Sequence, residues 1–445
     1  MKFAVYSNYK SSGAEWLGDV PSSWSVERLK YVASINDETL PETTDPDFQF
    51  QYVDIGSVDA QEGIKTVEDM LFESSPSRAR RIVRSGDTIV STVRTYLRAI
   101  APIADSQNNL IVSTGFAVIR PRRIQPRYLS YALRESSFVE TLVARSVGVS
   151  YPAVNSSEVA TIPIPIPSED EQTAIADYLD REMAKIDALI SKKRQLIERL
   201  KEMRTGLISR AVARGLPPEA ASAAGVEPNP ELKPSGVDWL GDVPKHWNVK
   251  AIKWASPVLR GASPRPIDDQ IYFDDDGEYA WVRISDVTSA GMYLEGTEQR
   301  LSELGSSLSI KLNPGALFLS IAGSVGKCCI TRIKCCIHDG FVYFPRFKGD
   351  QRYLYYVFAS GEPYQGLGKL GTQLNLNTDT VGSIKVAFPP HDEQAHIADY
   401  LDLETSRIDA LVQNVQHAIG RLQEYRAGLI TAAVTGKIDV RKEVA

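Results

Sequence analysis

Two long stretches of the chain carry apolar residues at the three- and four-residue spacing of a helix that packs along one side. The first follows Pro167 and the second follows Pro390. Each predicts a helix of about 45 residues, or about 65 Å. The apolar positions are Ile186, Leu189, Leu196, Leu200, Met203 and Leu207 in the first stretch, and Ile408, Leu411, Val415, Ala418, Leu422, Tyr425 and Leu429 in the second. Because a lone helix of this kind needs a partner, the pattern predicts a two-helix coiled coil. The alternative is that each helix packs back on its own domain.

The segments before these helices have the mixed pattern of α/β domains. Strand-like apolar runs occur at 88–93, 116–119, 316–321 and 341–344, and helical patterns occur at 127–133 and 352–358. Residues 216–236 are rich in proline and alanine and have no apolar period. That composition favours a linker that reverses the chain, which would make the two long helices antiparallel.

The chain repeats itself at a spacing of about 222 residues. The sequence WLGDVP at 16–21 returns at 239–244, ADYLD at 176–180 returns at 398–402, and GLI at 206–208 returns at 428–430. Such a period is far too long for a solenoid, so it indicates two whole domains, each with a trailing helix. The middles of the two copies share only scattered residues, which predicts one fold carrying two different surfaces.

We therefore expect an α+β protein with a pseudo-two-fold internal repeat. Two α/β domains would be separated by a long antiparallel two-helix coiled coil, in the form of a dumbbell. The expected boundaries are a first domain at 1–167, a first spacer helix at 168–214, a linker at 215–234, a second domain at 235–390, a second spacer helix at 391–437 and a tail at 438–445.

Charge is unevenly distributed, although the formal net charge is only −6. Residues 37–73 are strongly acidic, with Lys65 as the only basic residue. The next stretch reverses sign and contains Arg78, Arg80, Arg81, Arg84, Arg94, Arg98, Arg120, Arg122, Arg123, Arg127 and Arg134, with no lysine. The planar fork of arginine suits phosphates and guanine edges, so this stretch is a candidate nucleic-acid surface. The alternative is a solvated face that pairs with the acidic segment.

All four cysteines lie in one short segment, at positions 328, 329, 335 and 336. Adjacent cysteines in a strand point to opposite faces, whereas zinc ligands are spaced by two to four residues. The pattern therefore favours a short hairpin or strand pair with buried thiols over a zinc site or disulfides. We find no apolar run near the ~18 residues of a membrane span and no signal-peptide core, so we expect no membrane association and a cytoplasmic location.

Sequence signals for catalysis are weak. Residues 366–371 fit G-x-G-x-x-G but do not open a helix, and residues 323–327 resemble a phosphate loop without its glycine spacing. An Asn-Pro-Pro-aromatic segment of the amino-methyltransferases is missing. His338 and Asp339 could form a dyad, but no nucleophile lies nearby in the sequence. We therefore predict a non-catalytic protein with no metal and no cofactor.

The duplicated motifs resemble those of the specificity (S) subunits of type I restriction-modification enzymes. The segment KPSG at 233–236 with WLG at 239–241, Pro244 and Trp247, and its copy from Lys10 to Trp24, is similar to the start of a target-recognition domain. The helix starts after Pro390 and Pro167 resemble that family too, with Glu-Gln-x-x-Ile-Ala-x-x-Leu at 393–401 and 171–179. The two-copy layout covers nearly the whole chain.

This resemblance implies a DNA-recognition subunit that performs no chemistry. Each recognition domain would read one half of a bipartite double-stranded DNA target, and the helices would set the spacing. Two methyltransferase (M) subunits and the motor-nuclease (R) subunits would methylate and cleave, and the methyl donor would belong to the M subunits. Other interpretations are the DNA-recognition component of a related fused or two-part restriction system, a stand-alone methyltransferase or nuclease, and a purely structural coiled-coil scaffold.

Within this interpretation we choose candidate contacts by side-chain chemistry. Arg, Gln and Asn can form paired bonds to a base edge, and lysine suits phosphate. The candidates for DNA binding are Arg78, Arg80, Arg81, Arg94 and Arg98 in the first domain, and Arg283, Ser324, Lys327, Gln373 and Asn375 in the second. We expect the outer helix faces and the repeated Trp-Leu-Gly segments to contact the M subunits. The alternative for Trp16, Leu17, Trp239 and Leu240 is a place in the domain cores.

Overall fold

A computed structural model describes residues 4–103, 109–365, 367 and 376–441. The chain divides into two compact units. Unit 1 comprises Met1–Arg194 and Gln416–Ala445, and unit 2 comprises Gln195–Val415. Among the described residues, none of the helices combines the length and apolar character needed to cross a bilayer.

Unit 1 contains two four-stranded sheets that pack face to face. The first has the order β11 (Ile100–Pro102), β10 (Thr88–Ser91), β13 (Phe116–Pro121), β4 (Ala33–Ile35), and the second has the order β8 (Glu68–Leu71), β5 (Gln49–Val53), β12 (Leu110–Ser113), β9 (Ala79–Ile82). Strand β10 is buried on both sides because alternate residues point to opposite faces. Its Ile89 joins the core between the sheets, and its Val90 joins the core beneath the helices.

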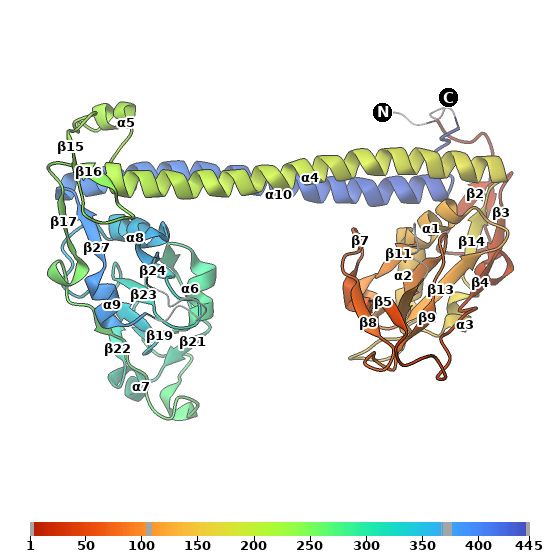
Figure 1. Ribbon diagram of the computed structural model, residues 1–445, viewed down its shortest axis with the longest axis horizontal. Coiled ribbons are helices and arrows are strands. Elements are labelled where there is room, and N and C mark those ends of the chain that lie inside the picture. Colours follow the sequence, from red (N-terminus) through yellow and green to blue (C-terminus); the bar gives the residue numbers. More distant parts are fainter. Residues whose placement is uncertain (1–3, 104–108, 366, 368–375, 442–445) are drawn as a thin grey trace. The chain divides into compact units, whose positions relative to one another are not determined.

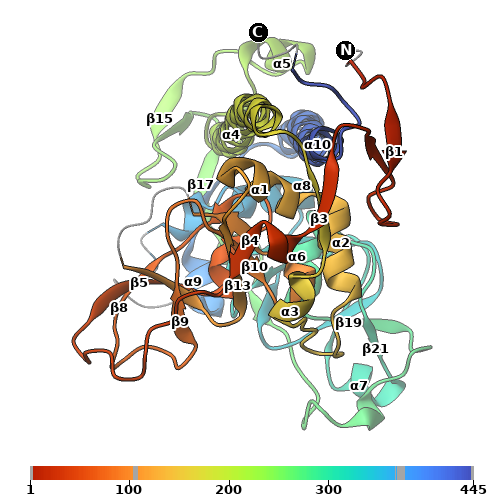
Figure 2. The ribbon, with the colours of Figure 1, turned by 90° about the vertical axis from the view of Figure 1, so that its right-hand side faces the viewer.

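Helices α1 (Pro126–Arg134) and α2 (Ser136–Ala144) cover the outer face of the first sheet in unit 1. Their starts are capped by side chains, since Tyr128 N donates to Gln125 at 2.6 Å and Phe138 N donates to Glu135 at 2.8 Å. Helix α1 lies between the strands and the long helices (Figure 1 and Figure 2). Short elements complete the unit: α3 (Ser156–Val159), β1 (Tyr9–Ser11), β2 (Asp19–Pro21), β3 (Ser25–Arg28), β6 (Val58–Asp59), β7 (Gly63–Ile64) and β14 (Pro163–Ile166).

Unit 2 repeats this plan. One sheet has the order β18 (Leu259–Arg260), β26 (Phe341–Tyr343), β23 (Leu317–Ser320), β24 (Cys328–Thr331), β20 (Tyr293–Leu294), and the other has the order β21 (Gln299–Leu301), β19 (Tyr279–Val282), β25 (Cys335–Ile337), β22 (Ile310–Leu312). Helix α8 (Gln351–Ala359) takes the place of α1. The remaining elements are α5 (Pro218–Ala223), α6 (Ile284–Ala290), α7 (Glu303–Ser307), α9 (Thr378–Ser383), β15 (Leu232–Pro234), β16 (Asp242–Pro244), β17 (Asn248–Ala251) and β27 (Lys385–Phe388). The α+β class and the repeat of two α/β domains are therefore confirmed.

The two long helices are α4 (Glu169–Arg214) and α10 (His391–Val434). Within unit 1 the Asp187 carboxylate accepts from Arg426 at 3.0 Å, and within unit 2 the Asp409 carboxylate accepts from Arg204 at 3.0 Å. The two aspartates occupy equivalent positions of the repeat, as do the two arginines. In each unit a residue early in one helix meets one late in the other, so the paired segments run antiparallel, as predicted.

The predicted apolar seam is only partly the buried one. Ile186, Leu200, Ile408 and Leu429 are buried, together with Ile190, Ile197 and Ile208, which the prediction omitted. Other predicted seam residues are exposed: Leu189, Leu196 and Met203 on α4, at a spacing of seven, and Leu411 and Tyr425 on α10, two heptads apart. Leu189, for example, is 48% exposed. Each helix carries two apolar stripes, and a heptad period identifies stripes without showing which of them meets the partner.

The cysteine segment is buried as predicted, but the predicted hairpin is wrong. Strand β24 belongs to one sheet and β25 to the other, so residues 332–334 connect the two layers. Cys329 of one sheet and Cys335 of the other both point into the core between the two sheets. Burial raises the pKa of the Cys335 thiol to about 11 and that of Cys329 to about 12. All four thiols are free, and no group of metal-ligating side chains occurs among the described residues.

Candidate nucleic-acid interface

In unit 1, several candidate residues meet at the edge where β12 turns into β13. Thr114 N donates to Arg78 O at 2.8 Å, and Thr92 N donates to Gly115 O at 2.8 Å. These bonds hold the start of β9 and the end of β10 against the same turn. We call Arg78, residues 92–98 and residues 114–115 edge 1.

Unit 2 has an equivalent edge where β25 turns into β26. Ile321 N donates to Gly340 O at 2.8 Å, which matches the bond between Thr92 and Gly115. Strand β19 runs parallel to β25 and ends beside this turn, followed by Arg283. A Cβ on Gly323 would lie 2.8 Å from Cδ1 of Ile284, the residue after Arg283. We call Arg283, residues 321–327 and residues 338–340 edge 2.

The five candidates of unit 1 are not all at the edge. Arg78 at the edge donates to Asp54 at 2.8 Å and to the Tyr52 hydroxyl at 3.3 Å, and these two partners raise its pKa. Arg94 and Arg98 lie on the β10–β11 turn, with Arg98 3.8 Å from Glu140. The other two lie along β9. Arg80 stacks over the Phe72 ring at 4.5 Å, and Arg81 is partly buried, which lowers its pKa.

Three of the five candidates of unit 2 gather at edge 2. Arg283 lies 3.5 Å from Glu298 and also donates to Gln299. Ser324 and Lys327 lie on the β23–β24 turn, where Lys327 N donates to the Ser320 hydroxyl at 3.1 Å. The phosphate-loop-like segment 323–327 is thus a tight turn between two strands, not a loop that opens a helix. Gln373 and Asn375 lie outside the described residues, as does most of the glycine motif at 366–371.

The sequence interpretation missed two arginines at edge 2. Arg260 donates to Asp339 O at 2.5 Å, and Arg265 lies 3.1 Å from the Asp339 carboxylate. Burial would raise the pKa of Asp339, but the Ser263 hydroxyl and the two arginines lower it overall. The sequence feature that could have pointed to them is the glycine at position 261. In the structure a Cβ there would lie only 2.2 Å from His338 O, so only glycine lets the Arg260 segment approach this turn closely.

The His338 Nδ1 lies 3.9 Å from the Asp339 carboxylate, beyond hydrogen-bonding distance. The His338 Nδ1 accepts from Gly340 N at 2.8 Å, and the ring packs 4.6 Å from that of Phe341. Burial lowers the His338 pKa. These contacts give the His338 ring a structural explanation.

Most other arginines of the basic stretch pair with the acidic segment or its neighbours, as the alternative proposed. The pairs are Arg84–Glu38 at 2.8 Å, Arg120–Asp87 at 2.8 Å, Arg122–Asp37 at 2.5 Å and Arg123–Glu27 at 3.2 Å. The basic stretch is therefore mainly a structural ion-pair network, although Arg84, Arg122 and Arg123 stay exposed while they pair.

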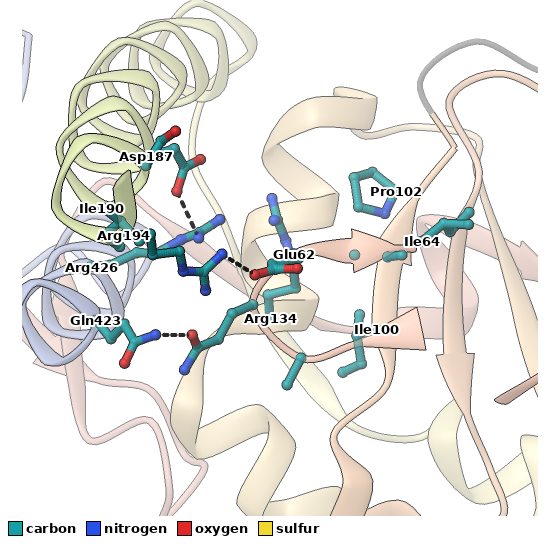
Figure 3. A pocket seen from close by; sticks show the side chains of 15 residues that line it. Glu62, Ile64, Ile100, Pro102, Arg134, Asp187, Ile190, Arg194, Gln423 and Arg426 are labelled. Carbon is teal, nitrogen blue, oxygen red and sulfur yellow. Dashed lines mark hydrogen bonds and ion pairs between the residues drawn. The ribbon is translucent and has the colours of Figure 1, made fainter. Parts of the chain in front are cut away.

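Unit 1 also contains a cavity of about 540 Å³ beneath the long helices (Figure 3). The hairpin β6–β7, β11, α1, α4 and α10 line it, and it is open to solvent on one side. Arg194 pairs with Glu62 at 2.6 Å and Arg426 pairs with Asp187 at 3.0 Å, while Arg134 donates to Ser130 O at 3.1 Å. Burial lowers the Arg134 pKa. None of the predicted contacts lines this cavity, but Arg98 of edge 1 lines an adjoining recess.

The repeated Trp-Leu-Gly segments favour the core alternative. Leu17 is 4% exposed and Leu240 is 3% exposed, and both are core residues. Trp16 and Trp239 are half-buried and pack against the cores of units 1 and 2. The leucines are therefore unavailable to a partner subunit.

Comparisons with known proteins agree with this architecture. A family model described as the type I restriction modification DNA specificity domain matches residues 21–199 and 244–419. A putative type I restriction enzyme MjaX specificity subunit of Methanocaldococcus jannaschii is 22% identical over 460 residues, covering 99% of each chain. The HindI specificity subunit of Haemophilus influenzae is 21% identical, covering 73% of this chain and 80% of that protein. A structure solved to explain complex assembly and conformational transition of the type I R-M system has 25% identity and a TM-score of 0.66, covering 93% of this chain and 98% of that chain.

Proposed function

The chain belongs to the type I restriction modification DNA specificity family, and from this we propose that it is the DNA-recognition subunit of a type I restriction-modification complex. Unit 1 reads one half of a bipartite target and unit 2 reads the other. Methylation and cleavage belong to M and R subunits. The complex acts on DNA in the cytoplasm, which suits a chain with four free thiols.

The observation that carries the proposal is the pair of equivalent edges with different side chains. Each edge is held by an equivalent backbone hydrogen bond, which is 2.8 Å long in both units. Edge 1 presents Arg78 and Arg94, whereas edge 2 presents Arg283, Ser324 and Lys327. A common frame with different hydrogen-bond donors is what two half-sites of different sequence require, because base edges are distinguished by donor and acceptor pattern.

A second observation concerns the partners. The exposed Leu189 and Met203 of α4 and the exposed Leu411 and Tyr425 of α10 occupy equivalent positions of the repeat, two heptads apart in each helix. A heptad-spaced apolar stripe on a helix is suited to a further helix. Because the stripe occurs twice, two copies of one partner fit, and we assign them to two M subunits. A native mass with one M subunit at saturating concentration would contradict this stoichiometry.

The proposal is tested by methylation sequencing of DNA modified by the chain together with its M subunit. We expect two defined half-sites separated by an unread gap of constant length. Alanine at Arg283 and Lys327 together should relax the base preference of one half-site and leave the other unchanged. A continuous motif, or no sequence preference in the unaltered complex, would contradict the proposed function.

The helices should act as the spacer between the half-sites. Seven residues inserted into both α4 and α10 would lengthen them by about 10 Å, or roughly three base pairs. Such an insertion also rotates the distal half-site by about 100°. We expect weaker binding to the original site, because the DNA must twist to fit, and any remaining methylation should show the same half-sites with a longer gap. Changed half-site bases with an unchanged gap would refute the spacer role.

A further inference from the structure

The β10–β11 turn of edge 1 holds two arginines in an unfavourable backbone conformation. Arg94 has φ 53° and ψ 48°, and Arg98 has φ 52° and ψ 34°, on either side of the 3₁₀ turn η3 (Thr95–Leu97). Among the described residues, the non-glycine residues with positive φ are these two and Asn36. A side chain with a Cβ is disfavoured in this region, and such residues concentrate at functional sites.

Unit 2 meets the same backbone requirement with glycine. In the equivalent β23–β24 turn, Gly323 has φ 65° and Gly326 has φ 85°. The two turns follow equivalent strands and are fastened by equivalent bonds, from Thr92 to Gly115 and from Ile321 to Gly340. Glycine adopts this conformation without strain. Unit 1 therefore carries arginine where the backbone alone favours glycine, which indicates that the side chain itself is needed.

The surrounding structure fixes the strained turn. Arg94 N donates to Pro152 O at 2.8 Å, and the hydroxyls of Thr95 and Ser146 are 2.7 Å apart. Arg98 N donates to Thr95 O at 2.9 Å. Such bonds allow a disfavoured conformation to persist. The Arg94 Cα is consequently held in place before any ligand binds.

The Arg94 side chain is oriented but not neutralised. Its Cζ lies 4.8 Å from the centroid of the Tyr151 ring, which is itself 63% exposed. Over the part of the chain that the structure describes, Arg94 forms no ion pair, in contrast to Arg78 and Arg98 of the same edge. A guanidinium stacked on an aromatic ring keeps its N–H donors at the rim available, and the ring limits their orientation. Tyr96 beside it is 54% exposed.

We propose that Arg94, supported by Tyr151, determines the identity of one base pair in the half-site of unit 1. Its two parallel N–H donors match the O6 and N7 acceptors of guanine in the major groove. The assignment rests on the proposed function and narrows it to one residue and one base. Arg78, which is already paired with Asp54, is left as a contact that positions the domain.

The strain provides a test that separates a structural role from a recognition role. In the complex with M subunits, Arg94→Gly should leave the Tm unchanged or raise it, because glycine relieves the left-handed strain. It should weaken binding to the target by about 10- to 100-fold, the range expected for one bidentate base contact. Discrimination should disappear at a single base pair of one half-site, measured by fluorescence anisotropy on targets with each pair replaced in turn.

Two further variants sharpen the test. Arg94→Lys keeps the charge but not the planar fork, so the salt dependence of binding should be retained while base discrimination is lost. Arg123→Ala is the matched control: it removes an exposed arginine of the same stretch that pairs with Glu27 at 3.2 Å, and the base preference should not change.

Three outcomes would overturn the inference. They are a lower Tm in Arg94→Gly with discrimination intact, an equal loss of affinity on every sequence, and unchanged affinity. The first makes Arg94 structural, the second makes it a phosphate contact, and the third removes it from the interface. A complex that prefers two half-sites but keeps its preference in Arg94→Gly refutes this inference alone, whereas an unaltered complex without sequence preference refutes the proposed function.

Discussion

Units 1 and 2 agree where each domain meets the long helices and differ where each faces outward. In unit 1, Arg127 pairs with Asp177 and Asp180, both at 2.7 Å. In unit 2, Arg352 pairs with the equivalent Asp399 and Asp402, at 2.6 and 2.9 Å. Contacts that survive in both copies form the frame, and the positions at which the copies diverge are the places to look for function.

The frame itself contains one asymmetry, at the buried acid near each helix start. In unit 1, Glu171 accepts from the Tyr6 hydroxyl at 2.6 Å, while the indole N–H of Trp24 is buried with no partner among the described residues. In unit 2, Glu393 accepts from Trp247 Nε1 at 3.0 Å and contacts His246 at 2.8 Å. The two tryptophans are equivalent in the repeat but only one is bonded.

The largest expected effect therefore comes from replacing these tryptophans. Trp24→Phe should cost about 1–2 kcal/mol for lost packing. Trp247→Phe should cost about 1.5–3 kcal/mol more, because it also leaves a buried carboxylate short of a donor. Urea denaturation, monitored by hydrogen exchange in each unit separately, measures the loss of stability in both variants. Equal costs would show that the indole bond to Glu393 contributes nothing.

A medium effect is expected from the pocket of unit 1 that Ser130 and Arg134 line together, next to the cavity of Figure 3. Helix α8 has Tyr355 and Ala359 at the positions where α1 has Ser130 and Arg134, so the larger side chain stands at the first position in unit 2 and at the second in unit 1. Ser130→Tyr combined with Arg134→Ala should stabilise unit 1 by about 1–2 kcal/mol, since it fills space and removes a charge whose pKa burial lowers.

Thermal denaturation measures this change, and Ser130→Ala is the control that leaves this pocket open. A double variant that is less stable than the unaltered chain would mean that the tyrosine cannot enter. It would also mean that the difference between α1 and α8 reaches beyond these two positions.

The smallest effect is expected from pH and falls on unit 2. Burial lowers the His338 pKa, whereas the nearby Asp339 opposes this shift. The unfolded chain takes up a proton at about pH 6.5, which the folded unit resists. Stability is therefore complete above that pH and decreases as the pH falls toward the lowered pKa of the folded state. Hydrogen exchange at pH 7.5 and 5.5 should show a loss of protection in unit 2 that His338→Gln reduces. The same loss in the variant would assign the effect to other groups.

The contacts that both units share were predictable from the sequence because the motifs that form them occur in both copies of the repeat. The matched motifs gave the two domains, the long helices and the burial of Leu17 and Leu240 as an alternative. Burial on one side of a helix was harder to predict, since Leu189 and Ile190 are equally apolar and only three-dimensional packing selects Ile190. The cysteine segment shows the same limit, because nearness in sequence does not decide which sheet a strand joins.

The candidate interface was predictable only in part. Composition drew attention to the arginine-rich stretch, and Arg94 is in it. Composition could not separate Arg94 from Arg80, whose side chain stacks on Phe72, because Phe72 lies in the turn after β8, distant in sequence from Arg80. Arg260 and Arg265 were not predicted because the sequence around them is not enriched in arginine. The left-handed backbone of Arg94 could not be predicted from the residues around it. Only the alignment of the two turns, which places Gly323 at the equivalent position, indicates it.

Unit 1 is built from two separated stretches of chain, and this affects the order in which the protein can be completed. Leu429, Ile430 and Val434 pack in the same core as Trp24 and Tyr128. Unit 2 is one continuous stretch, Gln195–Val415, so on the ribosome it can close while unit 1, begun earlier, still lacks its last helix segment. A nonsense mutation after Val415 would consequently spare the later-made unit and leave the earlier-made one with an open core. During normal synthesis, the same core of unit 1 is exposed until the last helix segment has been made, and it would need chaperone protection for that time.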